Sequence, residues 1–168
     1  MPEAWETFYL MVGSSAGALI GLLFVVITLT GEIDPTKITL AQSTFMSPTV
    51  FHFVTVLIIS SAAVVTILPV PAMALAIAVP AVIGTLKSLA AFLRLSSGRL
   101  AATHWTDYVY YGVLPTIGHL WLVLAAWAVW QGVGWAAYSV AAGAMALLLL
   151  GIRDAWDLAT WLVHSKKG

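Results

Sequence analysis

The sequence predicts an all-α integral membrane protein, with a bundle of five transmembrane helices and an amphipathic C-terminal extension. The chain of 168 residues is 61% hydrophobic and only 8% charged, and its mean hydropathy is +1.00. A soluble domain carries roughly 25% charged residues, so this much apolar surface does not fit inside one soluble core. Five apolar segments also reach the roughly 20 residues that a membrane-crossing helix needs. We therefore expect residues 1–168 to form a single five-pass membrane domain.

The expected passes are separated by residues that favour turns. The five passes cover approximately residues 8–29, 45–68, 71–95, 107–130 and 133–152. Asp34 and Pro35 favour a turn after the first pass, and Pro71 suits the first turn of the third helix. The links before the third and fifth passes are so short that each must join an antiparallel helix hairpin. Residues 153–165 are expected to continue or bend the last helix as an amphipathic segment at the membrane interface.

The distribution of basic residues predicts the orientation. In a five-pass bundle, the loops at 31–44 and 96–106 share one side of the membrane with the C-terminus. All seven basic residues lie on or toward that side: Lys37, Lys87, Arg94, Arg99, Arg153, Lys166 and Lys167. The positive-inside rule makes this side cytoplasmic, so the N-terminus is expected outside and the C-terminus inside. The N-terminal segment lacks the basic residues of a signal peptide, so we expect the first pass to be retained.

The composition excludes several classes of chemistry. Because the chain has no cysteine, it has no disulfide, no thiolate nucleophile and no cysteine metal site. The formal net charge of zero gives no indication of a nucleic acid partner. The sequence also has no phosphate-binding loop, no hydrolase elbow and no His-Glu-x-x-His motif. We therefore predict no cofactor and favour a non-enzymatic protein, with a divalent metal ion as the one cofactor left open.

Three glycines recur at a spacing of four residues within the first pass: Gly13, Gly17 and Gly21. They form a stripe about 12 Å long on one helix face. Glycine costs a helix about 1 kcal/mol relative to alanine, but in lipid it lets two helix backbones approach closely. The stripe therefore predicts helix packing, either within the chain or, as a glycine zipper, between subunits of a homo-oligomer. A bulky residue at Gly17 is expected to disrupt that contact.

Ionisable residues inside the passes are the first candidates for function. His119 lies about 18 Å along the fourth pass from Asp107, close to the membrane midplane. Intramembrane ionisable residues are functional by default, so we expect His119 and His52 to be polar positions along the path of an ion or solute. Alternatively, His119 makes only local hydrogen bonds. Lys87, the third ionisable residue inside a pass, is expected to extend to the cytoplasmic surface.

Two further expectations concern the histidines. Pro115 has no N–H to donate to the Tyr111 carbonyl, so a nearby polar side chain such as Thr116 or His119 is expected to hydrogen-bond locally. On the helix rise, the depths of His52 and His119 are expected to differ by roughly 8 Å. Because two histidines that bind one haem need nearly equal depth, this difference disfavours haem.

A second set of polar residues lies where the fourth pass begins and the fifth ends. His104 and Asp107 are three residues apart, as are Asp154 and Asp157. In an antiparallel hairpin the two pairs have similar depth. The favoured interpretation is a belt of salt bridges to nearby arginines. The alternatives are a proton relay and a divalent metal site, whose weak candidate ligands are these same four residues.

Three stretches carry a resemblance to a known family: GSSAGALIGLLFVVITL, FMSPTVFHF and LLLLGIRDAWDLATWL, with HWTDYVYY at the start of the fourth pass. On these stretches the chain resembles a family of small, uncharacterised bacterial multi-pass inner-membrane proteins with no assigned activity. The resemblance implies the bacterial inner membrane and hence a periplasmic N-terminus. It draws attention to the matching positions Pro48, Asp107, Trp156 and Asp157.

These features favour a small bacterial inner-membrane protein that forms a homo-oligomer and conducts or gates an ion or small solute. The lipid bilayer and other copies of the chain are then its partners. One alternative is a non-catalytic scaffold or regulatory subunit of a larger membrane complex. Another is a metal-dependent enzyme at the cytoplasmic leaflet, acting through His104, Asp107, Asp154 and Asp157.

The predicted orientation can be tested by labelling the two chain ends. We expect a tag after Met1 to react with membrane-impermeant reagents in the periplasm, because the N-terminus carries no basic residue. A tag after Gly168 should react only once the inner membrane is permeabilised. Protection of the N-terminal tag would contradict either the number of passes or their orientation.

Overall fold

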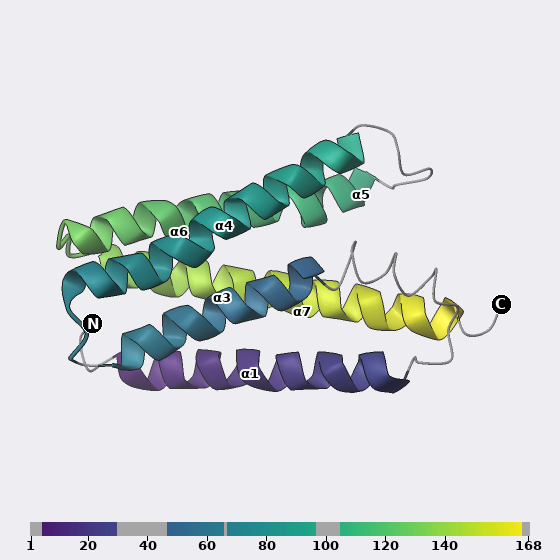
Figure 1. Ribbon diagram of the computed structural model, residues 1–168, viewed down its shortest axis with the longest axis horizontal. Coiled ribbons are helices and arrows are strands. Elements are labelled where there is room, and N and C mark those ends of the chain that lie inside the picture. The colour runs from purple at the N-terminus through teal and green to yellow at the C-terminus, as the bar shows by residue number, and fades with distance from the viewer. Residues whose placement is uncertain (1–4, 30–46, 66, 97–104, 166–168) are drawn as a thin grey trace.

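In a computed structural model, the protein is a bundle of helices that run along one long axis (Figure 1). The structure describes residues 5–29, 47–65, 67–96 and 105–165. Every regular element in these ranges is helical, which confirms the all-α expectation. The elements are α1 (Glu6–Leu29), α3 (Ser47–Val64), α4 (Val70–Ser96), α5 (Trp105–Asp107), the π-helix η3 (Tyr108–Val113), α6 (Leu114–Trp130) and α7 (Ala136–Ser165). α1, α4 and α7 run in one direction along the axis, and α3 and α6 run in the other.

Four apolar helical segments are long enough to cross a membrane: Glu6–Val26, Val70–Leu93, Tyr108–Trp130 and Ala136–Thr160. They correspond to the first, third, fourth and fifth expected passes. The second expected pass is also helical, but its apolar part, Pro48–Val64, is shorter than the other four. Four helices therefore have the length and composition of membrane-crossing helices, whereas the apolar part of α3 is too short to meet the same criterion by itself.

α3 is a short helix in the middle of the bundle. Its 18 residues give a length of about 27 Å, against roughly 30 Å for the hydrocarbon core of a bilayer. It contacts α1, α4 and α7, and its first turn stops short of the point where α4 and α7 end (Figure 1). Because other helices surround it, its buried positions include four polar residues: Thr49, His52, Thr55 and Ser60.

A π-helical turn interrupts the fourth expected pass. This turn, η3, is followed closely by Pro115, which has no N–H to donate to the Tyr111 carbonyl. The π-helical turn is wider than an α-helical turn, so the backbone adjusts there to the hydrogen bond that the Tyr111 carbonyl lacks. The Thr116 hydroxyl lies 2.6 Å from the Gly112 carbonyl oxygen and supplies a donor to the same turn. The result is that Tyr111 and Gly112 are buried in the bundle.

α7 is one continuous helix that ends at Ser165. The expected interfacial segment at 153–165 is therefore the last part of this helix and not a separate element. Asp154 and Leu158 are fully buried, whereas Trp156 is 70% exposed. The segment thus buries a polar residue and exposes an aromatic one, which is the reverse of an amphipathic helix on a soluble protein. It stays in the bundle because this buried face continues the packing of the preceding turns.

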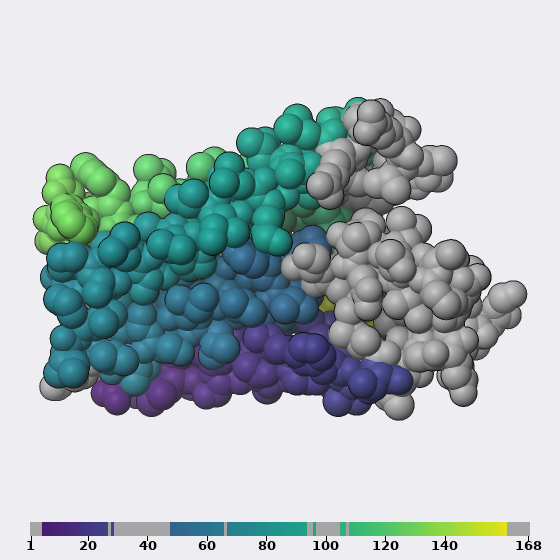
Figure 2. Space-filling model, viewed as in Figure 1, coloured from purple at the N-terminus to yellow at the C-terminus, as the bar shows by residue number. Residues whose placement is uncertain are grey.

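The outer surface of the bundle is apolar. Large hydrophobic side chains are exposed on each long helix, for example Leu22 on α1, Leu75 on α4, Leu124 on α6 and Leu149 on α7. Figure 2 shows the face of this surface that α1, α3 and α4 form. Contiguous exposed apolar surface of this extent is typical of membrane or interaction surfaces. The surface therefore agrees with the membrane class.

The glycine stripe of α1 divides into one packed position and two open ones. A Cβ on Gly13 would lie 2.8 Å from Cβ of Ser60, so α1 and α3 approach closely there. No described atom of another helix lies within 4 Å of a Cβ placed on Gly17 or Gly21. Within the described part of the chain, the stripe therefore packs internally at Gly13 and is open at the other two positions.

This difference predicts unequal effects of two leucine substitutions in α1. Gly13→Leu should lower the free energy of unfolding by about 1–3 kcal/mol, because the added side chain meets α3. Gly17→Leu should leave the protomer fold unchanged, so that any effect falls on the oligomer. Reversible unfolding in mixed detergent micelles measures the first quantity, and native mass measures the second. Equal destabilisation by the two substitutions would contradict the observed packing of α1.

Candidate functional site

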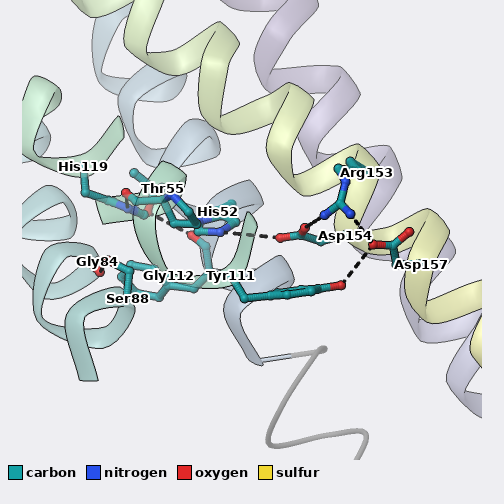
Figure 3. Close-up of polar contacts among 12 residues, drawn as sticks. His52, Thr55, Gly84, Ser88, Tyr111, Gly112, His119, Arg153, Asp154 and Asp157 are labelled. Carbon is teal, nitrogen blue, oxygen red and sulfur yellow. Dashed lines mark hydrogen bonds and ion pairs between the residues drawn. The ribbon is translucent and has the colours of Figure 1, made fainter. Parts of the chain in front are cut away.

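Three helices bring three ionisable side chains together inside the bundle (Figure 3). His52 comes from α3, His119 from α6 and Asp154 from α7, and at most 2% of each residue is exposed. The ring centroids of the two histidines are 5.2 Å apart. Nε2 of His52 lies 3.8 Å from Oδ2 of Asp154. These three residues, called the polar row below, connect the middle of α6 to the last part of α7.

His119 is held by its own helix. Its Nδ1 lies 2.7 Å from the carbonyl oxygen of Pro115. Because a carbonyl oxygen only accepts, Nδ1 carries the hydrogen, and Nε2 of the neutral ring keeps a lone pair. Nε2 has no hydrogen-bond partner among the described residues. His119 therefore presents a proton acceptor in the bundle interior.

The ring of His119 rests against α4 at Gly84. A Cβ on Gly84 would overlap the imidazole, so any other residue there would displace the ring. Beside this contact, the Ser88 hydroxyl donates to the Gly84 carbonyl oxygen at 2.9 Å. The Ser88 hydroxyl also lies 2.9 Å from the Thr116 hydroxyl of α6. These contacts hold α4 against α6 next to the polar row.

His52 and Asp154 face each other without forming a hydrogen bond. Their separation of 3.8 Å exceeds hydrogen-bond distance, and it makes an ion pair only when His52 is protonated. Neither ring nitrogen of His52 and neither carboxylate oxygen of Asp154 has a hydrogen-bond partner among the described residues. Buried polar atoms without partners are rare in folded proteins, and each requires an explanation. A water molecule between Nε2 of His52 and Oδ2 of Asp154 would give each of these two atoms a hydrogen-bond partner.

Arg153 and Asp157 form a second polar group beside Asp154. Nη2 of Arg153 lies 3.0 Å from Oδ2 of Asp157, and its Nη1 lies 3.6 Å from Oδ1 of Asp154. The Tyr111 hydroxyl donates to Oδ2 of Asp157 at 3.3 Å. The guanidinium of Arg153 also lies 3.3 Å from the ring centre of Tyr110. The two acids of α7 thus share one arginine, as the salt-bridge interpretation of the sequence expects.

A cavity of about 190 Å³ borders both histidines. Pro48 and Phe51, from the first two turns of α3, form part of its wall. Lys87 borders the cavity too, and its ammonium lies 5.2 Å from the Phe51 ring centre. The polar lining consists of His52, Lys87, Ser88, Tyr111 and His119. A space of this size with polar walls has room for several water molecules.

The expected difference in depth between His52 and His119 is wrong. The estimate of roughly 8 Å assumes that the second and fourth passes begin at the same level along the bundle axis. α3 instead begins deeper in the bundle than α5, which brings the two rings to 5.2 Å from each other (Figure 1). The shorter distance does not favour haem either, because rings 5.2 Å apart leave no room between them for a porphyrin.

The expected cluster of His104, Asp107, Asp154 and Asp157 is described only in part. His104 and the side chain of Asp107 lie outside the described residues. Among the described residues, no three His, Asp or Glu side chains converge to hold a metal ion. The part of this cluster that the structure does show is the pair of α7 acids around Arg153.

Two features of the site are not predicted from the sequence: the contact of Asp154 with His52 and the role of Gly84. A signal for the first was present, because Thr49, His52 and Thr55 recur every three residues and mark a polar face on the second pass. No sequence signal existed for Gly84, since its role depends on a ring that another helix supplies.

The fold and the polar row define an all-helical protein with four helices that could span a membrane and a buried ionisable site. No family model, no curated protein and no solved structure matches the chain. The function must therefore be inferred from the site itself.

The contact between Gly84 and His119 predicts that Gly84→Ala destabilises the fold. The added methyl group overlaps the imidazole, and overpacking of this kind costs about 1–3 kcal/mol. Gly21→Ala is the matched control, because it adds the same methyl group to a helix position that meets no described atom of another helix. Thermal unfolding in detergent compares the two variants. If Gly84→Ala were as stable as Gly21→Ala, the position of His119 against α4 would be contradicted.

Proposed function

We propose that the protein is a small bacterial inner-membrane protein that conducts or gates an ion or small solute through the interior of each protomer. The polar row is the single observation that supports this proposal most directly. The proposal keeps five passes, with the N-terminus in the periplasm and the C-terminus in the cytoplasm. In this orientation the cavity opens toward the cytoplasmic half, and the turn between α6 and α7 faces the periplasm.

The polar row would be costly in a bundle that had only a structural role. A buried polar group without a hydrogen bond costs roughly 1–3 kcal/mol in protein mutational data, and a charged group costs more. Apolar side chains of similar volume would pack at the same positions without this cost. In membrane proteins, buried ionisable residues of this kind mark ion pathways and proton relays.

The short α3 supports access to the polar row from one side. Its first turns line the cavity through Pro48 and Phe51, and His52 follows directly on the same wall. α3 is accommodated as the second of the five passes because α1, α4 and α7 surround it and shield much of its length from lipid.

Beyond the polar row the interior is mostly apolar, although Ser60 of α3 and Ser139 of α7 are also buried there. Ile59, Ile77 and Leu122 are fully buried and lie one or two helical turns further toward the turn between α6 and α7. An ion that enters from the cavity therefore meets a closed apolar layer in this conformation. Gating is for this reason part of the proposal, since the layer must open for conduction.

The homo-oligomer remains part of the proposal, although it does not form the path. The polar row lies within a single chain, so no second subunit is required to complete it. Gly17 and Gly21 leave one edge of α1 open to a helix of another copy.

The proposal predicts that His119→Ala changes ion flux but not assembly. The substitution removes the lone pair at the inner end of the polar row, so we expect flux into liposomes to change by about tenfold, the effect of 1.4 kcal/mol. Gln131→Ala is the control, because Gln131 is an exposed polar residue at the far end of α6. Flux assays with imposed ion gradients, together with native mass, measure both properties. If wild-type protein carried no ion or solute, the scaffold or regulatory subunit would become the better explanation.

A further inference from the structure

We infer that the ion is a proton: each protomer binds one proton on the pair of His52 and His119, beside the cavity, with Asp154 as its counter-charge. This inference rests on the proposed function and names the ion that the site carries. It follows from the donor atoms that surround the cavity, from the charges that face the histidines and from the distance between the two rings.

The donor atoms around the cavity suit a proton better than a metal cation. The polar lining provides imidazole, ammonium and hydroxyl groups but no carboxylate. Alkali ions are bound by shells of oxygen atoms, and calcium and magnesium require carboxylates or several carbonyl groups. A proton needs a single lone pair, which an unpartnered imidazole nitrogen supplies. Asp154, 3.8 Å from His52, disfavours an anion at the same place.

The proton transfer itself is simple to balance. A hydronium ion in the hydrated cavity loses one O–H bond and becomes water, while an N–H bond forms at Nε2 of His52 or of His119. Release reverses these two changes. Because Nδ1 of His119 keeps its hydrogen on the Pro115 carbonyl, this ring must accept and return the proton at Nε2. His119 is therefore the inner terminus of the proton path.

Asp154 makes a positive imidazole acceptable inside the bundle. A buried charge without an opposite charge is strongly destabilising, and the Asp154 carboxylate faces Nε2 of His52. On the same helix, Arg153 is already shared with Asp157, which leaves Asp154 incompletely paired. The protonated histidine thus completes a pair that Arg153 alone does not satisfy.

The other elements around the pair contribute few competing charges. α4 supplies the ammonium of Lys87 at the cavity, and η3 supplies the Tyr111 hydroxyl, which is bound to Asp157. The described part of α1 has Glu6 as its one charged side chain, at the far end of the bundle. Asp154 is therefore the carboxylate that faces His52 within the described chain.

The distance between the rings limits the site to one proton. Two imidazolium ions whose ring centroids are 5.2 Å apart would repel each other in a poorly solvated interior. A single carboxylate, that of Asp154, offsets one positive charge and not two. We therefore expect His52 and His119 to share one proton rather than to titrate independently.

A flux experiment on the full-length protein in liposomes tests the identity of the ion. The liposomes contain a pH-sensitive dye, and a potassium gradient with valinomycin sets the membrane potential. We expect wild-type protein to admit protons. We expect the proton flux through Asp154→Asn to be lower by about tenfold or more, because the buried counter-charge is lost. Glu6→Gln, the same change of acid to amide at an exposed position, should behave as wild type.

The outcomes separate this inference from the proposed function. Flux of sodium, potassium or chloride without proton flux would overturn the inference and leave the proposed function standing. Full proton flux through Asp154→Asn would also overturn the inference. The absence of any flux would overturn the proposed function, and the inference with it.

A second measurement does not depend on the folding of any Asp154 variant. Nitrogen NMR of ¹⁵N-histidine-labelled wild-type protein in nanodiscs distinguishes neutral from protonated rings, and His52→Gln assigns the His52 signals. We expect the two rings together to gain one proton as the pH is lowered. Uptake of two protons by the pair would overturn the inference. Uptake of no proton over the pH range in which the protein stays folded would overturn it as well.

Discussion

The burial of His119 between α3, α4 and α6 is the constraint on which the rest of the site depends. An imidazole among apolar helices needs a polar partner for one nitrogen and space for its ring. The carbonyl of Pro115 is the polar partner, and Gly84 leaves space for the ring because it has no side chain. The π-helical turn that precedes Pro115 is part of the same arrangement, because it places Tyr111 against the same cavity.

The position at which α3 begins decides what surrounds this histidine. Because α3 begins deeper than its neighbours, His52 in its second turn reaches the level of His119, and its first turn forms a cavity wall. The position at which this one helix begins therefore brings the two histidines together beside the cavity.

The last part of α7 departs from the rule for amphipathic helices in water. In water, a helix buries apolar residues and exposes polar ones. Here Asp154 is fully buried while Trp156 is exposed, although neither carboxylate oxygen of Asp154 has a hydrogen-bond partner among the described residues. The guanidinium of Arg153, which also contacts Tyr110, lies beside this acid on the side away from His52's Nε2 contact with Oδ2.

The sequence by itself determined the helical class, the approximate position of each helix and the presence of His52 and His119 within apolar helices. These properties follow from hydropathy, turn residues and the cost of polar groups in lipid, all of which are local along the chain. The tertiary structure alone decided that the two histidines meet, that Asp154 faces His52 and that Gly13 packs on α3 while Gly17 does not. The physical reason is that contacts between helices depend on where each helix begins along the bundle axis and which face it turns inward. Side-chain packing sets both, and no periodic pattern within one helix records them.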